Sequence, residues 1–128
     1  MVIDKTTNVL IVDDYRTMLR IIRNLLKQID FENVDEATDG VQALEKLRAG
    51  NFGMVISDWN MEPMTGLELL REVRADPKLK AIPFIMITAE GKVENVVAAK
   101  QAGVSNYIVK PFNAETLRGK IEKVLGHA

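Results

Sequence analysis

The chain alternates five times between a short apolar run and a longer segment with helical periodicity. The runs, rich in β-branched residues, are residues 9–12, 34–37, 54–56, 84–87 and 107–109. Val9–Val12 is continuously apolar, which is typical of a strand buried on both faces, whereas Val34–Ala37 is more polar, as edge strands are. Because strand and helix alternate, the pattern predicts right-handed crossovers and one parallel sheet with helices on both faces, a doubly wound α/β fold.

The first two helical segments show where their apolar faces lie. In the first segment, apolar residues recur at intervals of three and four, at Met18, Leu19, Ile22, Leu25, Leu26 and Ile29. The second segment begins after Asp39, an expected N-cap with Gln42 at the third helical position, and ends at Gly50. We expect its inward side chains to be Val41, Leu44 and Leu47.

The remaining helical segments have clear boundaries. Thr65 and Glu68 have the spacing of a capping box, which predicts a helix that starts there and ends before Pro77. Gly103 suits the end of the fourth segment, and Asn113 is expected to cap the last one. With 128 residues, 47% of them hydrophobic, and no linker or repeat, the chain is sized for one domain over residues 1–128.

The composition excludes several kinds of site and partner. Lys and Arg total 17 against 18 Asp and Glu, so no net basic field is present to bind nucleic acid or an anionic membrane. The absence of cysteine excludes disulfides, thiolate metal sites and a cysteine nucleophile. Residues 1–8 lack the apolar core of a signal peptide, and no apolar run approaches the roughly 20 residues that span a bilayer. We therefore expect a soluble, cytoplasmic protein whose partners bind a local surface.

Polar residues close four of the five apolar runs. They are Asp13 and Asp14 after the first, Asp58 after the third, Thr88 after the fourth and Lys110 after the fifth. Because the carboxyl ends of parallel strands share one edge, where open α/β sheets bind ligands, we expect these side chains to gather in one crevice. Taken singly, Asp13 and Asp14 are equally suited to cap a helix, and Thr88 to bond the backbone.

Three carboxylates, a hydroxyl and an ammonium in one crevice suit a divalent cation and a phosphoryl group. Two carboxylates about 4 Å apart repel by roughly 4 kcal/mol at an effective dielectric constant of about 20, and a divalent cation removes that cost. Oxygen ligands without Cys or a suitable His favour Mg²⁺ over zinc or copper. One Asp in such a site can attack a phosphoryl donor, because the metal and a nearby Lys neutralise the developing charge.

At these residues the chain resembles the receiver domain of two-component response regulators. The matching segments, in the family's order, are Val9–Asp14, Asp58–Met61, Thr88–Glu90 and Lys110–Phe112, and the resemblance covers essentially the whole chain. Within the family, the sequence is most similar to the stand-alone chemotaxis regulators. The resemblance implies a flavodoxin/CheY-like sheet of five parallel strands in the order 2-1-3-4-5, in a single receiver domain without an output domain.

The resemblance also implies residue roles. Asp58 is the expected phosphoacceptor, and Thr88 and Lys110 are expected to contact the phosphoryl oxygens. The expected Mg²⁺ ligands are Asp13, Asp14, Asp58 and the backbone carbonyl of Asn60. Asn60 and Glu90 are expected to tune loss of the phosphoryl group.

A switch is implied as well. Thr88 is expected to move toward the phosphoryl group while the ring of Tyr107 turns inward, which remodels the face built by the fourth helix, fifth strand and fifth helix. Output-face candidates are Lys92, Tyr107 and Lys120. A partner that binds the remodelled face better shifts the population of the two states. Without the resemblance, Tyr107 is more simply an aromatic packed in the core.

The expected partners are proteins. The resemblance implies a CheA-like histidine kinase as phosphoryl donor, a FliM-like flagellar motor switch protein or another output protein as target, and a phosphatase. We expect a monomer that binds neither nucleic acid nor membrane. It is expected not to be an enzyme but a phosphoacceptor signalling domain that assists its own phosphorylation and dephosphorylation. The chain departs from the family at Glu62, since proline there follows one residue later, at Pro63. This charge near the crevice is hypothesised to alter metal affinity or kinase recognition.

Three alternatives use similar parts. A phosphate sink or relay receiver outside motility has the same site and another output. A phosphatase of the haloacid dehalogenase type has an aspartyl nucleophile, Lys and Mg²⁺, but usually a second Asp where this chain has Asn60. A flavodoxin-like electron carrier needs a hydroxyl- and glycine-rich phosphate loop after the first strand, where Asp13 and Asp14 instead repel phosphate.

Overall fold

The computed structural model describes residues 5–89 and 93–125. The strands are β1 (Val9–Val12), β2 (Val34–Ala37), β3 (Met54–Asp58), β4 (Phe84–Thr88) and β5 (Asn106–Val109). The helices are α1 (Arg16–Gln28), α2 (Gly40–Ala49), α3 (Gly66–Ala75), α4 (Val93–Gln101) and α5 (Ala114–Leu125). Within the described residues, no helix combines the length and apolar character that a bilayer crossing requires.

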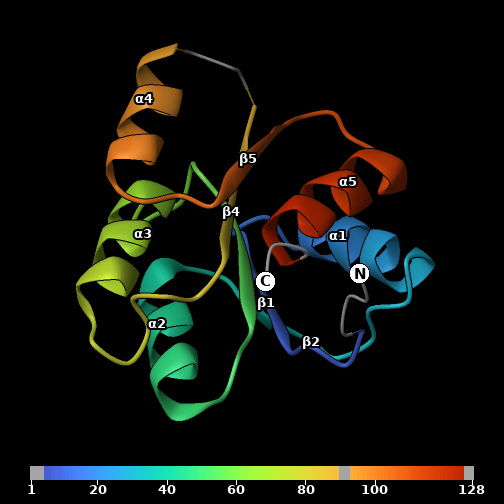
Figure 1. Cartoon of the computed structure of the whole chain (residues 1–128), viewed down its shortest axis with the longest axis horizontal. Coiled ribbons are helices and arrows are strands. Elements are labelled where there is room, and N and C mark those ends of the chain that lie inside the picture. Colours follow the sequence, from blue (N-terminus) through green and yellow to red (C-terminus); the bar gives the residue numbers. More distant parts are fainter. Residues whose placement is uncertain (1–4, 90–92, 126–128) are drawn as a thin grey trace.

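All five strands pair in parallel, in the order β2-β1-β3-β4-β5. Helices α1 and α5 cover one face of the sheet, and α2, α3 and α4 cover the other (Figure 1). The predicted doubly wound fold and its strand order are therefore confirmed. In this register Asp58 lies opposite Ile87 and Thr88 opposite Val109, so the carboxyl ends of the strands form one edge.

The core consists of two apolar clusters, one on each side of the sheet. Leu10 and Val12 belong to the cluster under α2 and α3, whereas Val9 and Ile11 belong to the cluster under α1 and α5. This alternation follows from the period of two in a strand. Every residue of β1, β3 and β4 is buried, which confirms that the continuous apolar runs are the central strands.

Polar side chains of β2 and of α2 occupy backbone groups of the edge strand β2. The Asp35 carboxylate accepts the N–H of Glu36 at 2.8 Å. The ammonium of Lys46 donates to the Glu36 carbonyl at 2.6 Å and to Asp35 at 3.1 Å. These bonds satisfy backbone groups on a strand that has a neighbour on one side only.

Side-chain caps fix the helix starts that the sequence predicted. Thr65 and Glu68 form both bonds of the capping box, each at 3.1 Å. The Asp39 carboxylate accepts the N–H of Gln42 at 2.8 Å, and Asn113 likewise caps α5 through the N–H of Thr116 at 2.8 Å. These caps set the points at which α2, α3 and α5 leave the crevice edge.

The prediction that Val41 faces inward is wrong. Its side chain is 45% exposed, and the buried face of α2 runs instead through Gly40, Ala43, Leu44 and Leu47. The helix packs closely at Gly40, where a Cβ atom would lie 2.7 Å from the Met64 sulfur. Small residues at the contact rotate the buried stripe away from the larger Val41.

Arg74, near the end of α3, bonds two loops at the end of the sheet opposite the crevice. Its guanidinium donates to the Gly103 carbonyl at 2.8 Å, the Lys80 carbonyl at 3.1 Å and the Ile82 carbonyl at 2.6 Å. Gly103 has a φ of 93°, the left-handed conformation expected of a glycine after a helix. One side chain therefore joins the chain before β4 to the chain before β5.

Candidate functional site

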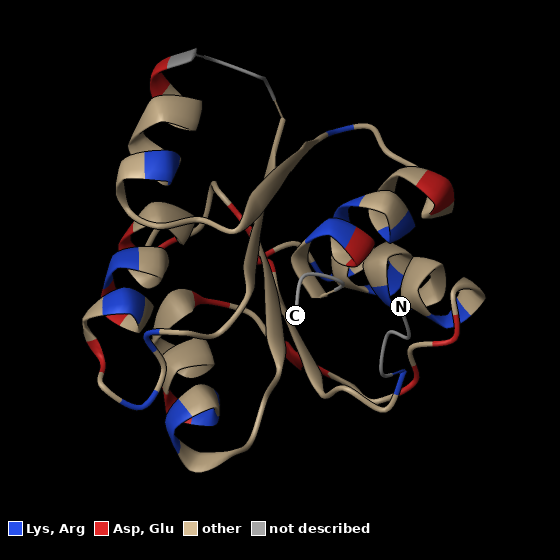
Figure 2. Cartoon of the chain, in the orientation of Figure 1, with Lys and Arg blue, Asp and Glu red and all other residues tan. Residues whose placement is uncertain are grey.

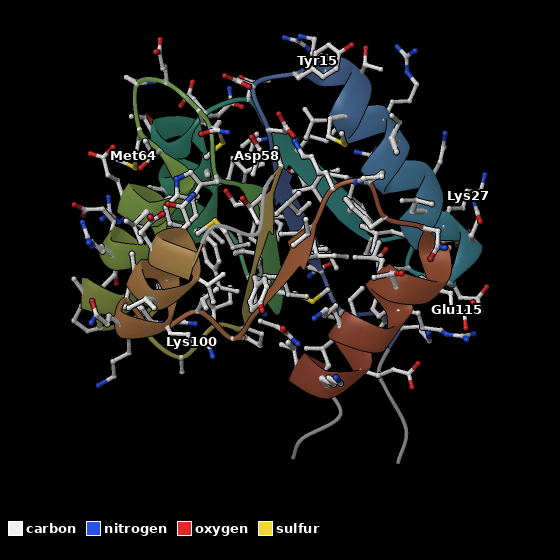
Figure 3. All side chains as sticks on the ribbon, turned by 90° about the horizontal axis from the view of Figure 1, so that it is seen from above. Tyr15, Lys27, Asp58, Met64, Lys100 and Glu115 are labelled. Carbon is white, nitrogen blue, oxygen red and sulfur yellow. The ribbon has the colours of Figure 1, made fainter. Side chains whose placement is uncertain are left out.

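The carboxyl edge of the sheet gathers the polar residues that close the strands. Asp58 ends β3, Thr88 ends β4, and Asp13 and Lys110 directly follow β1 and β5. The first three are buried, with 4%, 6% and 1% of their surface exposed, respectively. In Figure 3, Asp58 is labelled in the upper part of the view, with Tyr15 at the start of α1 beyond it. The four side chains therefore lie at one edge of the sheet, and the space among them is called the crevice below.

Within the described part of the chain, Asp58 is held by one cation and one backbone amide. Its Oδ1 lies 2.8 Å from Nζ of Lys110, and its Oδ2 accepts the N–H of Asn60 at 3.1 Å. The Asp58 side chain is 6% exposed and that of Lys110 is 25% exposed. The charge of the buried carboxylate is thus compensated by a lysine that still reaches solvent.

Asp13 is only half satisfied. Its Oδ1 accepts the N–H of Tyr15 at 2.9 Å, whereas Oδ2 is buried without a hydrogen-bond partner among the described residues. Burial raises the pKa of Asp13 to about 6; the Tyr15 N–H opposes this rise, and the negative charge of Asp58 adds to it. A buried acceptor without a donor is costly, so this oxygen is suited to bind a cation.

The carboxylates do not form a complete metal cage by themselves. Asp14 is exposed, although its charge contributes to the raised pKa of Asp13. Among residues 5–89 and 93–125, no three acidic, His or Cys side chains converge closely enough to hold a metal ion. The free oxygen of Asp13 and the oxygen-only donors nevertheless suit Mg²⁺, which retains several waters and needs few protein ligands.

Thr88 and Tyr107 border the same small cavity. Its lining residues are Trp59, Met86, Thr88, Asn95, Val96, Ala99 and Tyr107. The ring of Tyr107 is half-buried against the core cluster on the α3 side of the sheet. The structure therefore brings together the two residues that the resemblance couples.

The other predicted positions differ in how they are placed. Asn60 is exposed beside Asp58, and Nζ of Lys120 lies 5.2 Å from the centre of the Tyr107 ring. Glu90 and Lys92 lie outside the described residues. Glu62 is exposed, and its peptide bond to Pro63 is cis, as is that between Lys110 and Pro111. Acidic and basic residues occur along the helices of both layers (Figure 2).

Sequence reasoning missed Gly66, which supports the backbone of the site. A Cβ atom there would collide with the Asp58 carbonyl oxygen and lie 2.8 Å from the Met86 sulfur. The N–H of Gly66 donates to the Trp59 carbonyl at 2.9 Å. The sequence contains one signal for this role, a glycine at the first position of a capped helix. A helical position does not need the left-handed conformation that usually explains a glycine.

The family model for the response regulator receiver domain matches residues 9–122. The chain is 54% identical over 116 residues to the chemotaxis protein CheY of Pseudomonas aeruginosa, covering 91% of this chain and 94% of that protein. It superposes on the chemotaxis response regulator CheY4 of Vibrio cholerae with a TM-score of 0.86 and 37% identity, over 94% of this chain and 99% of that one.

Similarity extends to the response regulator TrrA of Thermotoga maritima, whose structure is in complex with Mg²⁺ and BeF. The TM-score is 0.82 and the identity 32%, over 94% of this chain and 100% of that one. Family match, identity and fold agree along nearly the full length. The chain belongs to the receiver domains of two-component response regulators, a family of signalling domains.

Proposed function

We propose that this chain accepts a phosphoryl group from a histidine kinase on Asp58, in a Mg²⁺-dependent reaction. The observation that carries this proposal is the buried Asp58 carboxylate, paired with Lys110 at 2.8 Å beside the unpartnered oxygen of Asp13. A carboxylate, a cation and a free anionic oxygen in one crevice are what a phosphoryl acceptor requires.

The residues divide the chemistry between them. A carboxylate oxygen of Asp58 attacks phosphorus, the P–N bond of the donor phosphohistidine breaks, and the electron pair stays on the imidazole nitrogen. The ammonium of Lys110 then neutralises charge on the phosphoryl oxygens, and the Thr88 hydroxyl donates to one of them. Asp13, Asp14, Asp58 and the Asn60 carbonyl would hold Mg²⁺. When bound, that ion supplies further charge neutralisation at the phosphoryl group.

The proposed output is a change at the face of α4, β5 and α5. Thr88 moves toward the phosphoryl group and the Tyr107 ring turns into the cavity that both residues line. Tyr107, Lys92 and Lys120 form the face that a partner reads, and Asn60 with Glu90 tunes loss of the phosphoryl group. Binding of the partner to the remodelled face shifts the population.

The similarity to chemotaxis proteins supports a motility role. We propose a CheA-like kinase as donor, a FliM-like flagellar motor switch protein as output target, and a phosphatase that ends the signal. In this proposal the chain acts in the cytoplasm as a monomeric, single receiver domain. A phosphate sink or relay receiver outside motility is the second candidate, because it would use the same Asp58 and Lys110.

Intact mass after incubation with acetyl phosphate and Mg²⁺ tests the phosphoacceptor. We expect one phosphoryl adduct that EDTA prevents and that Asp58→Asn lacks. Asp30→Asn, an exposed Asp far from the crevice in sequence, is the matched control and should keep the adduct. An adduct that persists in Asp58→Asn would place the acceptor elsewhere, and no adduct in the parent protein would reject the proposal.

Binding of the phosphorylated form to a flagellar motor switch protein separates the two output candidates. Calorimetry should show tighter binding with the adduct than without it if the chain acts at the motor. Equal or absent binding, with the adduct present, favours the sink or relay role.

A further inference from the structure

The side chain of Lys120 crosses the open edge of the sheet. Helix α5 packs on one face, with Leu117 and Ile121 in the core cluster there, whereas Tyr107 packs against the cluster on the other face. Figure 1 shows β5 between α4 and α5. The ammonium of Lys120 nevertheless lies 5.2 Å from the centre of the Tyr107 ring. A cation from one face therefore contacts an aromatic ring on the other, around the edge strand.

Asn106 holds the ammonium at this crossing. Its Oδ1 accepts from Nζ of Lys120 at 3.5 Å and from the N–H of Tyr107 at 2.9 Å. Among the ion pairs of the described residues, none joins Lys120 to a carboxylate. An amide oxygen and the face of a ring are thus the contacts that fix this charge.

The Tyr107 ring is shared between the ammonium and the cavity. It lines the small cavity with Thr88 and Asn95, and it lies beneath the Lys120 ammonium. A ring that moves into the cavity moves away from the cation. The resting and the inward position of the Tyr107 ring therefore differ by one cation–π contact, which the inward position lacks.

We propose that Asn106 and Lys120 are positioning residues that hold the Tyr107 ring in its half-buried resting place and set how readily it switches. This rests on the proposed function, because it takes Tyr107 as the switch residue. A cation–π contact at a solvent-accessible site changes an equilibrium constant about two- to fivefold. Inward movement of the ring also frees the ammonium for an acidic group of a partner.

A single fluorine label tests the resting position directly. The chain has two tyrosines, so 3-fluorotyrosine in a Tyr15→Phe background labels only Tyr107. Without any ligand, Lys120→Met should shift the ¹⁹F resonance, because the ring loses its cation. Lys123→Met removes an exposed lysine from the same helix and should not. An unchanged resonance in Lys120→Met, or equal shifts in both variants, overturns the proposal.

Opposite substitutions at Asn106 test the coupling to the site, with Mg²⁺ and beryllium fluoride as the probe. Asn106→Ala removes the acceptor and should bind the probe about two- to fivefold more tightly, as should Lys120→Met. Asn106→Asp strengthens the hold on Lys120, so this variant should bind the probe more weakly than the parent. Unchanged affinities, or the same direction in both Asn106 variants, overturn the proposal.

The proposed switch and the proposed hold on the Tyr107 ring can fail separately. If saturating Mg²⁺ and beryllium fluoride leave the Tyr107 resonance of the labelled parent unmoved, the proposed switch is wrong. The ligand-free comparison of Lys120→Met with Lys123→Met then decides by itself whether the ring is held by the ammonium.

Discussion

The ammonium of Lys110 reaches within 2.8 Å of the Asp58 carboxylate although the strands that precede them are not neighbours. Strand β4 lies between β3 and β5, so the lysine spans the end of β4, where Thr88 stands. The ion pair therefore links the two ends of a three-strand segment across the crevice, and it holds anion, hydroxyl and cation in one row.

Replacing Lys110 with Met should weaken both folding and chemistry. Asp58 is 6% exposed and, among the contacts of the described residues, would keep the Asn60 N–H alone, so the free energy of unfolding at pH 7 should fall by about 1–3 kcal/mol. The rate of phosphorylation by acetyl phosphate should fall about a hundredfold, because a fixed cation at the transferred group is lost. Urea unfolding and timed intact-mass measurements check the two effects. A variant that phosphorylates at the parent rate contradicts the role given to Lys110.

Replacing Asp13 with Asn should stabilise the metal-free protein at neutral pH. The pKa of Asp13 is about 6 in the folded protein against 3.8 for an ordinary Asp, so the folded state prefers the protonated form. Its ionisation therefore costs stability, which is regained as pH falls from about 6 to below 3.8. Above pH 6 in EDTA, Asp13→Asn should gain about 2–3 kcal/mol over the parent, and the difference should shrink toward pH 4.

Urea unfolding at several pH values measures this difference. Asp14→Asn is the control, since that carboxylate is exposed and should change stability much less. A difference between parent and Asp13→Asn that stays constant from pH 8 to pH 4 would show that the buried charge is not its cause.

Magnesium should offset the difference in stability between Asp13→Asn and the parent. A cation that binds only the folded state stabilises it by RT ln(1 + [Mg²⁺]/Kd), which is about 2.7 kcal/mol at a hundred times Kd. The parent has the buried free oxygen of Asp13, and Asp13→Asn does not have that anion. Thermal unfolding with Mg²⁺ or with EDTA should therefore show a metal-dependent increase in the parent and little in the variant. An equal increase in both would mean that the ion binds elsewhere.

Two glycine-to-alanine substitutions should have opposite signs. Gly66→Ala forces a Cβ atom against the Asp58 carbonyl and the Met86 side chain, and should cost about 1–3 kcal/mol and change Trp59 fluorescence. Gly119→Ala meets nothing within 4 Å in the exposed part of α5, and should stabilise by about 0.5–1 kcal/mol. Urea unfolding followed by tryptophan fluorescence checks both. A neutral Gly66→Ala would show that the close approach is easily relaxed.

Arg74→Lys should destabilise the fold even though the charge is kept. A lysine ammonium cannot replace the fork that reaches Gly103, Lys80 and Ile82 together, so we expect a loss of about 1–2 kcal/mol. Arg71→Lys, on an exposed position of the same helix, should be nearly neutral. Thermal unfolding of Arg74→Lys and Arg71→Lys tests this prediction. Equal stabilities of the two variants would show that Arg74 contributes no more than an exposed surface residue.

Much of the fold could be predicted because it follows from local periodicity. The strands β1 and β2 have the bounds that the apolar runs predicted, and the caps at Thr65 and Asn113 lie where the sequence placed them. Sequence spacing also placed Asp58 and Lys110 at one edge, because parallel strands bring their carboxyl ends together. That inference needs the topology but no detail of packing.

The remainder depends on contacts that no local pattern encodes. Val41 faces outward because Gly40, which has no side chain, and the small Ala43 lie on the buried face of α2, which an apolar stripe does not reveal. The half-satisfied state of Asp13 follows from burial and from which oxygen the Tyr15 N–H reaches. Asn106 lies outside the apolar run at residues 107–109 that predicted the fifth strand, and its bond to Lys120 requires α5 to lie beside β5.

On both outer strands, a side chain accepts a hydrogen bond from the next backbone N–H. This contact affects how copies of this protein behave at high concentration. The Asp35 carboxylate accepts the backbone N–H of Glu36 on β2, and the Asn106 amide oxygen accepts that of Tyr107 on β5. An occupied amide on each outer strand makes the sheet a poorer template for the growth of intermolecular sheets. These two bonds therefore favour contacts through the helical faces over pairing between the strands of different copies.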